Sequence, residues 1–209
     1  MGYLFTSESV TSGHPDKLSD FISDSILDEC LRLDPNARVA IEVFIKGIDI
    51  DNMNTPKSYI IIGGEISLNS EINIDYENIA RNCMINIGYT NSDIGMNATN
   101  AKDCEVIVLV NKQSEEISQG VNALGAGDQG IIFGYATNES ENFKETEGSF
   151  MPLPIILAHR LTSEITKRRL EGTLDWARPD GKSQVTIAYN DDGFPQYVDT
   201  VVIAIQHDD

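Results

Sequence analysis

The sequence predicts an α+β protein assembled from repeated two-layer units, in which a helix layer covers an antiparallel sheet. Three observations lead to this class. Some stretches carry apolar residues at helical spacing, others alternate apolar and polar residues, and the order helix, strand, hairpin, strand occurs twice along the 209 residues. The outer sheet faces are apolar enough that we expect another unit or a second subunit to cover them.

The first helix is expected to begin at Pro15, since proline suits the first helical position, and to end at Asp34-Pro35. Its core-facing stripe is Leu18, Phe21, Ile22, Ile26, Cys30 and Leu33. A different face carries carboxylates that we interpret as solvated surface, namely Asp20, Asp24 and Asp28. Before the helix we expect a short apolar piece over residues 3–5 and a polar turn over residues 6–9.

Two strands are expected after this helix. Residues 38–46 alternate apolar and polar side chains, and residues 59–62 return after a polar hairpin loop over residues 48–57. Glu42 lies inside the first strand, and a carboxylate on a half-buried strand needs a partner unless it lies on the exposed face. Two interpretations of Glu42 stay open: a structural one, in which it lies on an exposed face or forms an ion pair, and a functional one, in which it binds a metal or a substrate. The returning strand ends in Gly63-Gly64-Glu65, which indicates close backbone approach to a ligand, or a bulge.

The first half continues with a second helix over residues 76–87, stopped by Gly88, and a buried strand over residues 104–110. This strand delivers residues 112–114 to its C-terminal end, where functional loops tend to lie. Residues 114–130 are glycine-rich and loop-like, so they form a candidate lid.

The second half repeats the plan. A helix is expected within residues 151–169, followed by a strand over residues 183–189, a tight turn over residues 190–193 and a strand over residues 197–206.

Two phosphate-binding patterns in the sequence lack their structural context. Residues 125–130 spell a G-x-G-x-x-G pattern, but a polar loop precedes it and an extended stretch, Ile131–Phe133, follows, which excludes a dinucleotide fingerprint. Gly181-Lys182-Ser183 resembles the end of a P-loop, but Trp176 stands where the first glycine should be.

Composition narrows the class of partner and compartment. With 15 Lys and Arg against 33 Asp and Glu, the formal charge of −18 argues against nucleic acid and anionic membranes as partners. Any phosphate pocket must gather its own cations, because charges are screened over about 8 Å. Cys30, Cys83 and Cys104 form no CxxC pair, no secretion signal is evident and apolar runs are too short to span a membrane. We therefore expect a cytoplasmic protein.

The stretch from Gly13 to Lys17 is the strongest chemical signal. It places a histidine, a carboxylate and an ammonium in the first turn of a helix, where free N–H groups and the helix dipole favour an anion. His14 and Lys17 strengthen that preference, whereas Asp16 would repel a phosphate unless a divalent cation such as Mg²⁺ bridged the two. Two interpretations stay open: a Mg²⁺–polyphosphate site, or an ordinary helix cap.

A series of short strings, in order along the chain, closely resembles the S-adenosylmethionine synthetase (methionine adenosyltransferase) family. The similarity extends from Phe5 to His207. The strings are residues 5–10, 13–17, 63–66, 112–114, 125–130, 133–137, 158–161, 178–180 and 182–186.

The resemblance implies a reaction of ATP with L-methionine, in which the methionine sulfur attacks the ribose C5′ and tripolyphosphate leaves and is then hydrolysed to pyrophosphate and phosphate. Mg²⁺ and K⁺ are the implied cofactors. The implied ATP residues are His14, Lys17, Asp128, Asp180 and Lys182, of which His14 and Lys182 are catalytic. The implied methionine residues are Glu65, Gln113 and Asp128, and the implied metal ligands are Asp16 for Mg²⁺ and Glu42 for K⁺.

The resemblance also implies a domain plan. It gives an N-terminal domain over residues 1–113, a gating loop over residues 114–124 and a central domain over residues 125–209, with the family's third, C-terminal domain absent. The gating loop is shorter than is usual in the family, and residues 48–57 and 143–150 resemble insertions. A homodimer or homotetramer with active sites between subunits is expected, formed through the sheet faces.

Two alternatives belong to other functional classes. One is a truncated, inactive paralogue or fragment that binds nucleotide or pairs with a full-length subunit. The other, more remote, is a J-domain-like cochaperone, because His14-Pro15-Asp16 is also the signature of those domains. J-domains carry a basic helix before this tripeptide, whereas the 13 residues before His14 include no Lys or Arg.

Overall fold

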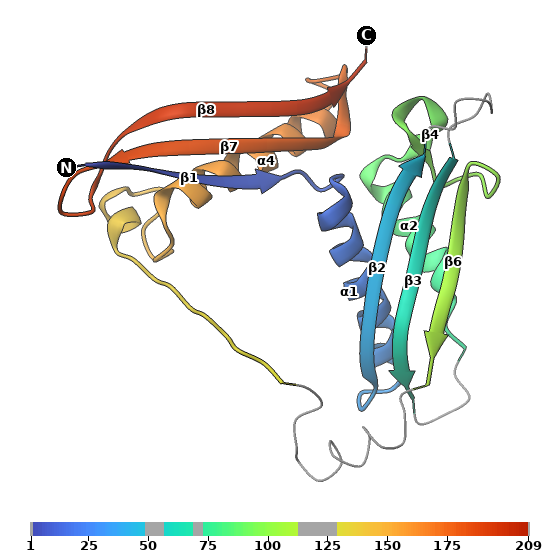
Figure 1. Ribbon diagram of the computed structural model, residues 1–209. Coiled ribbons are helices and arrows are strands. Elements are labelled where there is room, and N and C mark those ends of the chain that lie inside the picture. The colour runs from blue at the N-terminus through green and yellow to red at the C-terminus, as the bar shows by residue number, and fades with distance from the viewer. Residues whose placement is uncertain (1, 49–56, 69–72, 113–128, 209) are drawn as a thin grey trace. The chain divides into compact units, whose positions relative to one another are not determined.

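The computed structural model describes residues 2–48, 57–68, 73–112 and 129–208 (Figure 1). The chain divides into two compact units, one formed by residues 15–131 and the other by residues 1–14 together with residues 132–209. The elements are, in order, β1 (Tyr3–Val10), α1 (Pro15–Leu33), β2 (Arg38–Ile48), β3 (Lys57–Ser67), α2 (Tyr76–Ile87), β4 (Thr90–Asn91), η1 (Ser92–Ile94), β5 (Met96–Asn97), β6 (Cys104–Asn111), η2 (Glu139–Asn142), α4 (Leu153–Leu170), β7 (Ala177–Tyr189) and β8 (Pro195–His207).

The predicted α+β class is confirmed, and one detail of it is wrong. Each unit has helix on one face of a three-stranded sheet, with strand order β2-β3-β6 in one and β1-β7-β8 in the other. The second sheet is antiparallel throughout, whereas β3 and β6 pair in parallel. The parallel pair arises because α2 lies between these strands in the chain and carries it back to the edge where β3 began.

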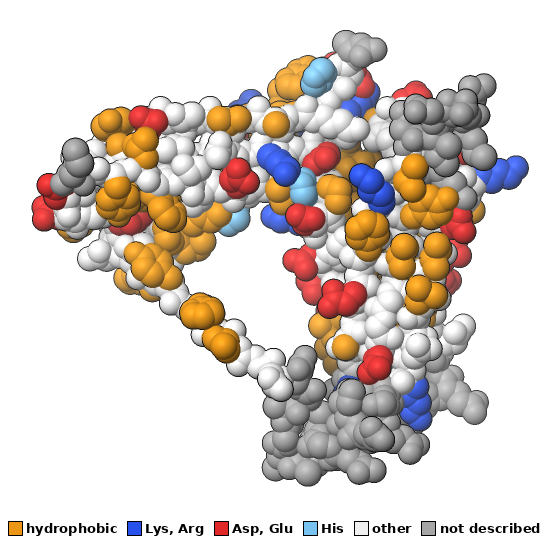
Figure 2. All heavy atoms as spheres, viewed as in Figure 1, with side chains coloured by type: hydrophobic (Ala, Val, Ile, Leu, Met, Phe, Trp, Pro, Cys, Tyr) orange, Lys and Arg blue, Asp and Glu red, His pale blue; other side chains and the backbone are white. Residues whose placement is uncertain are grey.

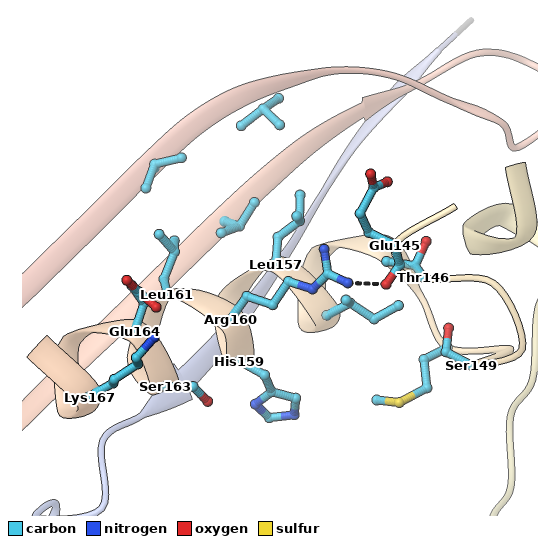
Figure 3. Close-up of a pocket in the computed structure, with 15 residues that line it drawn as sticks. Glu145, Thr146, Ser149, Leu157, His159, Arg160, Leu161, Ser163, Glu164 and Lys167 are labelled. Atoms are coloured by element: carbon cyan, nitrogen blue, oxygen red, sulfur yellow. Dashed lines mark hydrogen bonds between the residues drawn. The ribbon is translucent and has the colours of Figure 1, made fainter. Parts of the chain in front are cut away.

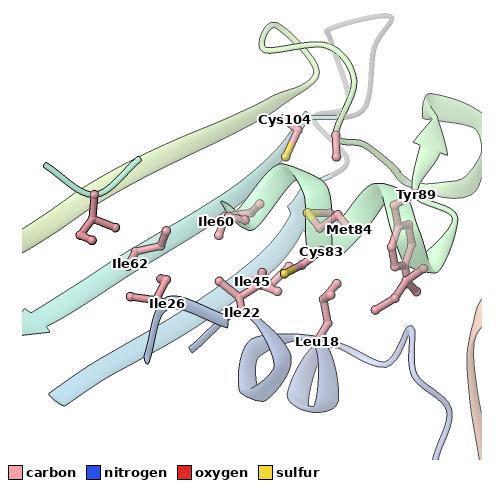
Figure 4. Packing of buried hydrophobic residues seen from close by; sticks show 14 of the residues in the cluster. Leu18, Ile22, Ile26, Ile45, Ile60, Ile62, Cys83, Met84, Tyr89 and Cys104 are labelled. Carbon is pink, nitrogen blue, oxygen red and sulfur yellow. The ribbon is translucent and has the colours of Figure 1, made fainter. Parts of the chain in front are cut away.

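The core of the unit formed by residues 15–131 lies between α1, α2 and the sheet (Figure 4). Most of the predicted stripe of α1 supplies its centre, where Leu18, Ile22, Ile26 and Cys30 are fully buried. The prediction is wrong for Phe21, which is 42% exposed. They pack against apolar side chains of β2 and β3, including Ile45, Ile60 and Ile62. The helix begins at Pro15 as predicted.

The second helix, α2, has the boundaries that the sequence predicts. Asp75 caps its start by accepting from the Asn78 amide at 3.0 Å, and Gly88 ends it at a φ of 112°. Arg81 then secures the connection to β6, because its guanidinium donates to the carbonyls of Ala98 at 3.0 Å and Cys104 at 2.9 Å. The chain between α2 and β6 is thereby held by a side chain of the helix.

The polar turn expected over residues 6–9 is wrong, because these residues belong to strand β1. This strand pairs with β7 from Tyr3 opposite Tyr189 to Val10 opposite Lys182. The N-terminal strand therefore completes the sheet of the unit that contains residues 132–209. An alternation of apolar residues is absent from residues 6–9, since hydroxyl groups take the inward positions.

A buried polar seam joins α4 to this sheet. The Ser9 hydroxyl lies 2.7 Å from His159 Nδ1 and 3.1 Å from Thr162 Oγ1, and Ser183 donates to the Ala158 carbonyl at 2.8 Å. Ser9, Thr162 and Ser183 are all buried. Because each buried hydroxyl has a partner, the seam fixes the position of α4 without a desolvation penalty from unmet polar groups.

The start of α4 rests on a buried carboxylate. Glu139 Oε1 accepts from the Leu153 amide at 2.6 Å and from the Tyr189 hydroxyl at 2.8 Å. The ring of Tyr189 stacks on Tyr3, with centroids 5.1 Å apart. Burial, reinforced by the bond to Glu139, raises the pKa of Tyr189 above its ordinary value. The tyrosine therefore stays protonated and acts as the donor.

Several strands are longer than the sequence predicts. The returning strand does not end at residue 62, since β3 continues to Ser67, and β7 begins at Ala177 rather than 183. The turn over residues 190–193 is confirmed by a bond from the Asn190 amide to the Phe194 carbonyl at 3.0 Å. Residues 129–137 form no helix and residues 181–183 lie in a strand, so both rejected phosphate motifs lack the required helix.

Replacing Tyr189 by Phe is expected to lower the free energy of unfolding by about 1–3 kcal/mol, because the buried Glu139 carboxylate loses a donor. Urea denaturation at pH 7 measures this loss. An unfolded tyrosine ionises near pH 10, whereas Tyr189 in the folded chain resists ionisation, so wild-type stability falls as the pH rises above about 10. The variant should show a shallower fall.

Tyr3→Phe is the matched control, because Tyr3 is half exposed and keeps its stacked ring in the variant. Its stability should change by less than about 0.5 kcal/mol. Equal losses in the two variants would show that the hydroxyl of Tyr189 is not what supports α4.

Candidate functional site

The chain that leaves β1 is tied directly to the start of β7. The Thr11 amide donates to the Gly181 carbonyl at 2.9 Å, and the Thr11 hydroxyl donates to the Pro179 carbonyl at 2.7 Å. The His14 amide donates back to the Thr11 carbonyl at 3.1 Å, which closes a turn. Two of the predicted strings, residues 13–17 and residues 178–180, thus meet at Gly13 and Pro179 although they are far apart in sequence.

Gly13 allows this close approach. A Cβ at this position would lie 2.4 Å from both the carbonyl oxygen and the Cβ of Pro179, closer than any side chain tolerates. Both residues are buried. The glycine is therefore required by the packing of the two segments, since its φ is not in the left-handed region.

Lys182 lies on the sheet face opposite α4. Its neighbours Ser183 and Val185 point toward the helix, and strand alternation places the exposed Lys182 side chain on the other face. Glu8 shares that open face, where it accepts from Gln184 at 3.3 Å. Glu8 is not among the site residues predicted from the sequence, because residues 6–9 were expected to form a turn. A period-two pattern of hydroxyls was the signal available for the strand.

Asp180 stands one residue from the carbonyls that Thr11 binds. It is half buried, and it precedes Gly181, which is buried against Thr11. Asp180 and Lys182 therefore lie on the segment that Thr11 ties to the turn containing His14. A histidine, a carboxylate and an ammonium in this arrangement suit an anionic ligand with a bound cation.

Asp16 and Lys17 are the second and third residues of α1, and both are exposed. A carboxylate oxygen at an exposed helix start suits Mg²⁺, which commonly binds one or two carboxylates together with substrate phosphates. Among the described residues, no three side chains of His, Cys, Asp or Glu cluster closely enough to hold a metal by themselves. The donor set fits a metal that shares its coordination with a ligand.

Glu42 and Glu65 share the open face of sheet β2-β3-β6. Glu42 pairs with Gly63, and Glu65 pairs with Ala40 and with Asn111 of β6. The two carboxylates are diagonal neighbours, which lie roughly 7–8 Å apart in sheets. Glu42 is exposed, which agrees with the exposed face that the sequence left open, and its role as a metal ligand stays a prediction. The neighbouring Ile41 and Val43 point inward and pack against the core. Two carboxylates, Glu42 and Glu65, on one open face suit a cation.

Gly64 explains the paired glycines beside Glu65. It has a φ of 131°, and a Cβ there would lie 2.0 Å from the Ala40 carbonyl oxygen. The close approach is therefore to strand β2, and the β2–β3 register continues without a shift through Gly63 and Gly64. The bulge that the sequence left open is therefore wrong, whereas the close approach to a ligand stays a prediction.

Three further predictions lie outside the described residues. They concern Gln113, Asp128 and the gating loop over residues 114–124.

A groove of about 920 Å³ lies between α4 and β8 (Figure 3). Leu157 and Leu161 point from α4 into it, and Val198 and Val201 of β8 line it. Arg160 borders it and donates to the Glu145 carbonyl. None of the described site residues predicted from the sequence lines this groove, and its walls are mainly apolar. It is therefore not the candidate active site.

An apolar surface covers the open face of sheet β2-β3-β6 (Figure 2). Phe44 and Leu109 are each 60% exposed there, and Ile61 lies between them in the register. This confirms the expectation that the outer face of this sheet is apolar. Within the described ranges, every helix is too short or too polar to traverse a bilayer.

The fold defines a class: a repeated two-layer α+β protein. Its candidate site residues remain those that the sequence predicts. The chain matches the profile of the S-adenosylmethionine synthetase N-terminal domain over residues 2–115 and that of the central domain over residues 123–209. It is 47% identical to the S-adenosylmethionine synthase of Mesoplasma florum over 213 aligned residues, covering all of this chain and 50% of that protein.

Other relatives agree. The S-adenosylmethionine synthase of Mycoplasma capricolum is 47% identical over 98% of this chain and 48% of its own length, and that of Brachyspira hyodysenteriae is 45% identical over 98% and 50%. The chain therefore belongs to the S-adenosylmethionine synthetase family. It spans about half the length of the curated relatives that it matches.

The family profiles and the compact units divide the chain differently. The N-terminal profile includes β1, whereas β1 packs in the sheet with β7 and β8. The domain plan expected from the resemblance therefore stays a proposal, with an N-terminal domain over residues 1–113, a gating loop over 114–124 and a central domain over 125–209.

Replacing Gly13 by Ala is expected to lower the free energy of unfolding by about 1–3 kcal/mol, because the new methyl group overlaps the Pro179 backbone. Thermal denaturation measures the loss. Gly134→Ala is the matched control, since nothing lies within 4 Å of a Cβ at that position. A Gly13→Ala variant as stable as this control would show that the two segments do not pack closely.

Proposed function

We propose that this chain forms S-adenosylmethionine from ATP and L-methionine. The observation that carries the proposal is the β1–β7 ladder, which brings the string containing His14 beside the string containing Asp180 and Lys182. Family membership and the names of the relatives support the same reaction.

The reaction is a displacement at carbon. The methionine sulfur forms a bond to the ribose C5′ while the bond from C5′ to the tripolyphosphate oxygen breaks, and the electron pair leaves with the polyphosphate. Little proton transfer is needed, so the protein acts by alignment and by stabilising the leaving charge. His14 and Lys182 would hold the polyphosphate. Asp180 lies between Pro179 and Gly181, whose carbonyls Thr11 binds, and would contact ATP, as would Lys17 in the first turn of α1.

The metal ligands and the methionine residues belong to the unit of residues 15–131. Asp16 would hold Mg²⁺, which when bound supplies charge neutralisation to the polyphosphate. Glu42 would hold K⁺. Glu65 would bind methionine together with Gln113, since a carboxylate complements an α-ammonium group, and Asp128 would lie at both substrates.

The setting of the reaction is also proposed. Three cysteines, Cys30, Cys83 and Cys104, are free and buried, and burial raises the pKa of each thiol. Unreactive free thiols suit a reducing compartment, so we place the protein in the cytoplasm. The apolar face around Phe44 suits association of two or four copies through their sheets, with active sites between subunits.

A second candidate is a fragment or paralogue without activity of its own. The chain spans about half the length of the curated relatives that it matches, and this is the observation behind the second candidate. Such a chain would bind nucleotide, or pair with a full-length subunit, and form no product.

Asp16→Asn is expected to reduce formation of S-adenosylmethionine by about a hundredfold, because charge stabilisation by a bound metal is worth several kcal/mol. The assay incubates the chain with ATP, methionine, Mg²⁺ and K⁺ and follows S-adenosylmethionine, pyrophosphate and phosphate together. Asp20→Asn is the control, since Asp20 is an exposed carboxylate one turn further along α1. A folded wild-type chain that forms no product favours the inactive alternative.

Phe44→Asp is expected to weaken self-association at least about tenfold, because it places a charge in the proposed interface. Sedimentation velocity over a range of concentrations measures the dissociation constant. Leu170→Asp is the matched control, as Leu170 is 64% exposed at the end of α4. The interface proposal fails if both variants associate like the wild type.

A further inference from the structure

Thr11 makes an unusual number of contacts for one small side chain. It is only 3% exposed, and its hydroxyl lies 2.7 Å from the Pro179 carbonyl oxygen and 3.2 Å from the Gly181 carbonyl oxygen. Its amide donates to the same Gly181 carbonyl, and its carbonyl accepts from the His14 amide. Its methyl group stands 3.2 Å from where a Cβ of Gly181 would be. Every part of the residue joins β7 to the turn that carries His14.

Residues 178–180 of β7, which Thr11 contacts, have no regular partners in the neighbouring strand β8. The register between β7 and β8 is interrupted between Ala177 and Gly181, so Pro179 is left out of the ladder. Pro179 is buried, and a buried carbonyl without a donor costs about 1–3 kcal/mol. The Thr11 hydroxyl supplies the donor that β8 does not.

We propose that Thr11 is a positioning residue of the polyphosphate site: its hydroxyl fixes the spacing between His14 and Lys182. This inference rests on the proposed function, because it concerns the residues that hold the polyphosphate. Thr11 touches no substrate itself. It acts through Pro179 and Gly181, whose carbonyls set the path of the chain into Lys182.

The alternative is a hydroxyl that only stabilises the fold. Thr146 makes this distinction testable, since it is 4% exposed and its hydroxyl also donates to two carbonyls, Ser140 at 2.6 Å and Phe143 at 3.1 Å. It lies in the same unit and is remote from Lys182 in sequence. Thr146→Val therefore removes an equivalent hydroxyl without touching the proposed site.

The experiment measures binding of inorganic tripolyphosphate in the presence of Mg²⁺ by titration calorimetry, using the whole chain. Thr11→Val is expected to raise the dissociation constant for tripolyphosphate about tenfold. This is the loss expected when one residue that hydrogen-bonds the polyphosphate is displaced from its position. Thr11→Ser keeps the hydroxyl and should stay within about threefold of the wild type. Thr146→Val should bind like the wild type, even where its stability is lowered as much as that of Thr11→Val.

Each other outcome has a distinct meaning. If Thr11→Val binds like the wild type, or if Thr146→Val weakens binding equally, the positioning role is overturned while the proposed function stands. If the wild type itself does not bind tripolyphosphate, the proposed function fails, and the role of Thr11 fails with it. Should Thr11→Val not fold, Thr11→Ala replaces it, because the smaller side chain also removes the hydroxyl donor, and the same tenfold loss is expected.

Discussion

The antiparallel ladder between β1 and β7 is the constraint on which the rest of the candidate site depends. It joins the first residues of the chain to a strand near its other end, with Val10 opposite Lys182. The seam of hydroxyls beneath α4 and the capping carboxylate Glu139 both secure the strands of this ladder or the helix on it. A shift of one residue would turn Lys182 toward α4 and Ser183 toward solvent, so register and site are specified together.

The helices could be predicted from the sequence because their signals are local. Pro15 marks the start of α1, Gly88 marks the end of α2, and apolar spacing marks the faces that meet the core. β1 could not be predicted in full, because its inward position at Ser9 is satisfied by hydrogen bonds to α4 instead of by apolar contact. A search for alternating apolar residues does not detect a strand whose inward side chains are polar. The parallel pairing of β3 with β6 depends on the path of α2, which no short window contains.

The candidate site also has features that the local sequence predicts and features that depend on the fold. The chemistry of Gly13 to Lys17 is local, since a helix start with a histidine, a carboxylate and an ammonium favours a polyphosphate with a metal. The union of His14 with Lys182 is not local, and residue types alone do not predict it. Glu42 shows the limit most plainly: its place in a strand was predictable, but its exposure depends on what covers the sheet.

The same ladder sets an order of events during synthesis. Residues 15–131 form a unit that is continuous in sequence, so its contacts are available while the ribosome still elongates the chain. β1 leaves the ribosome first and has no sheet to join until β7 follows. At about 5–20 residues per second, that interval is on the order of 10–40 s. During it, Leu4 and Phe5 belong to an unpaired strand, and such a strand edge is open to pairing with other chains.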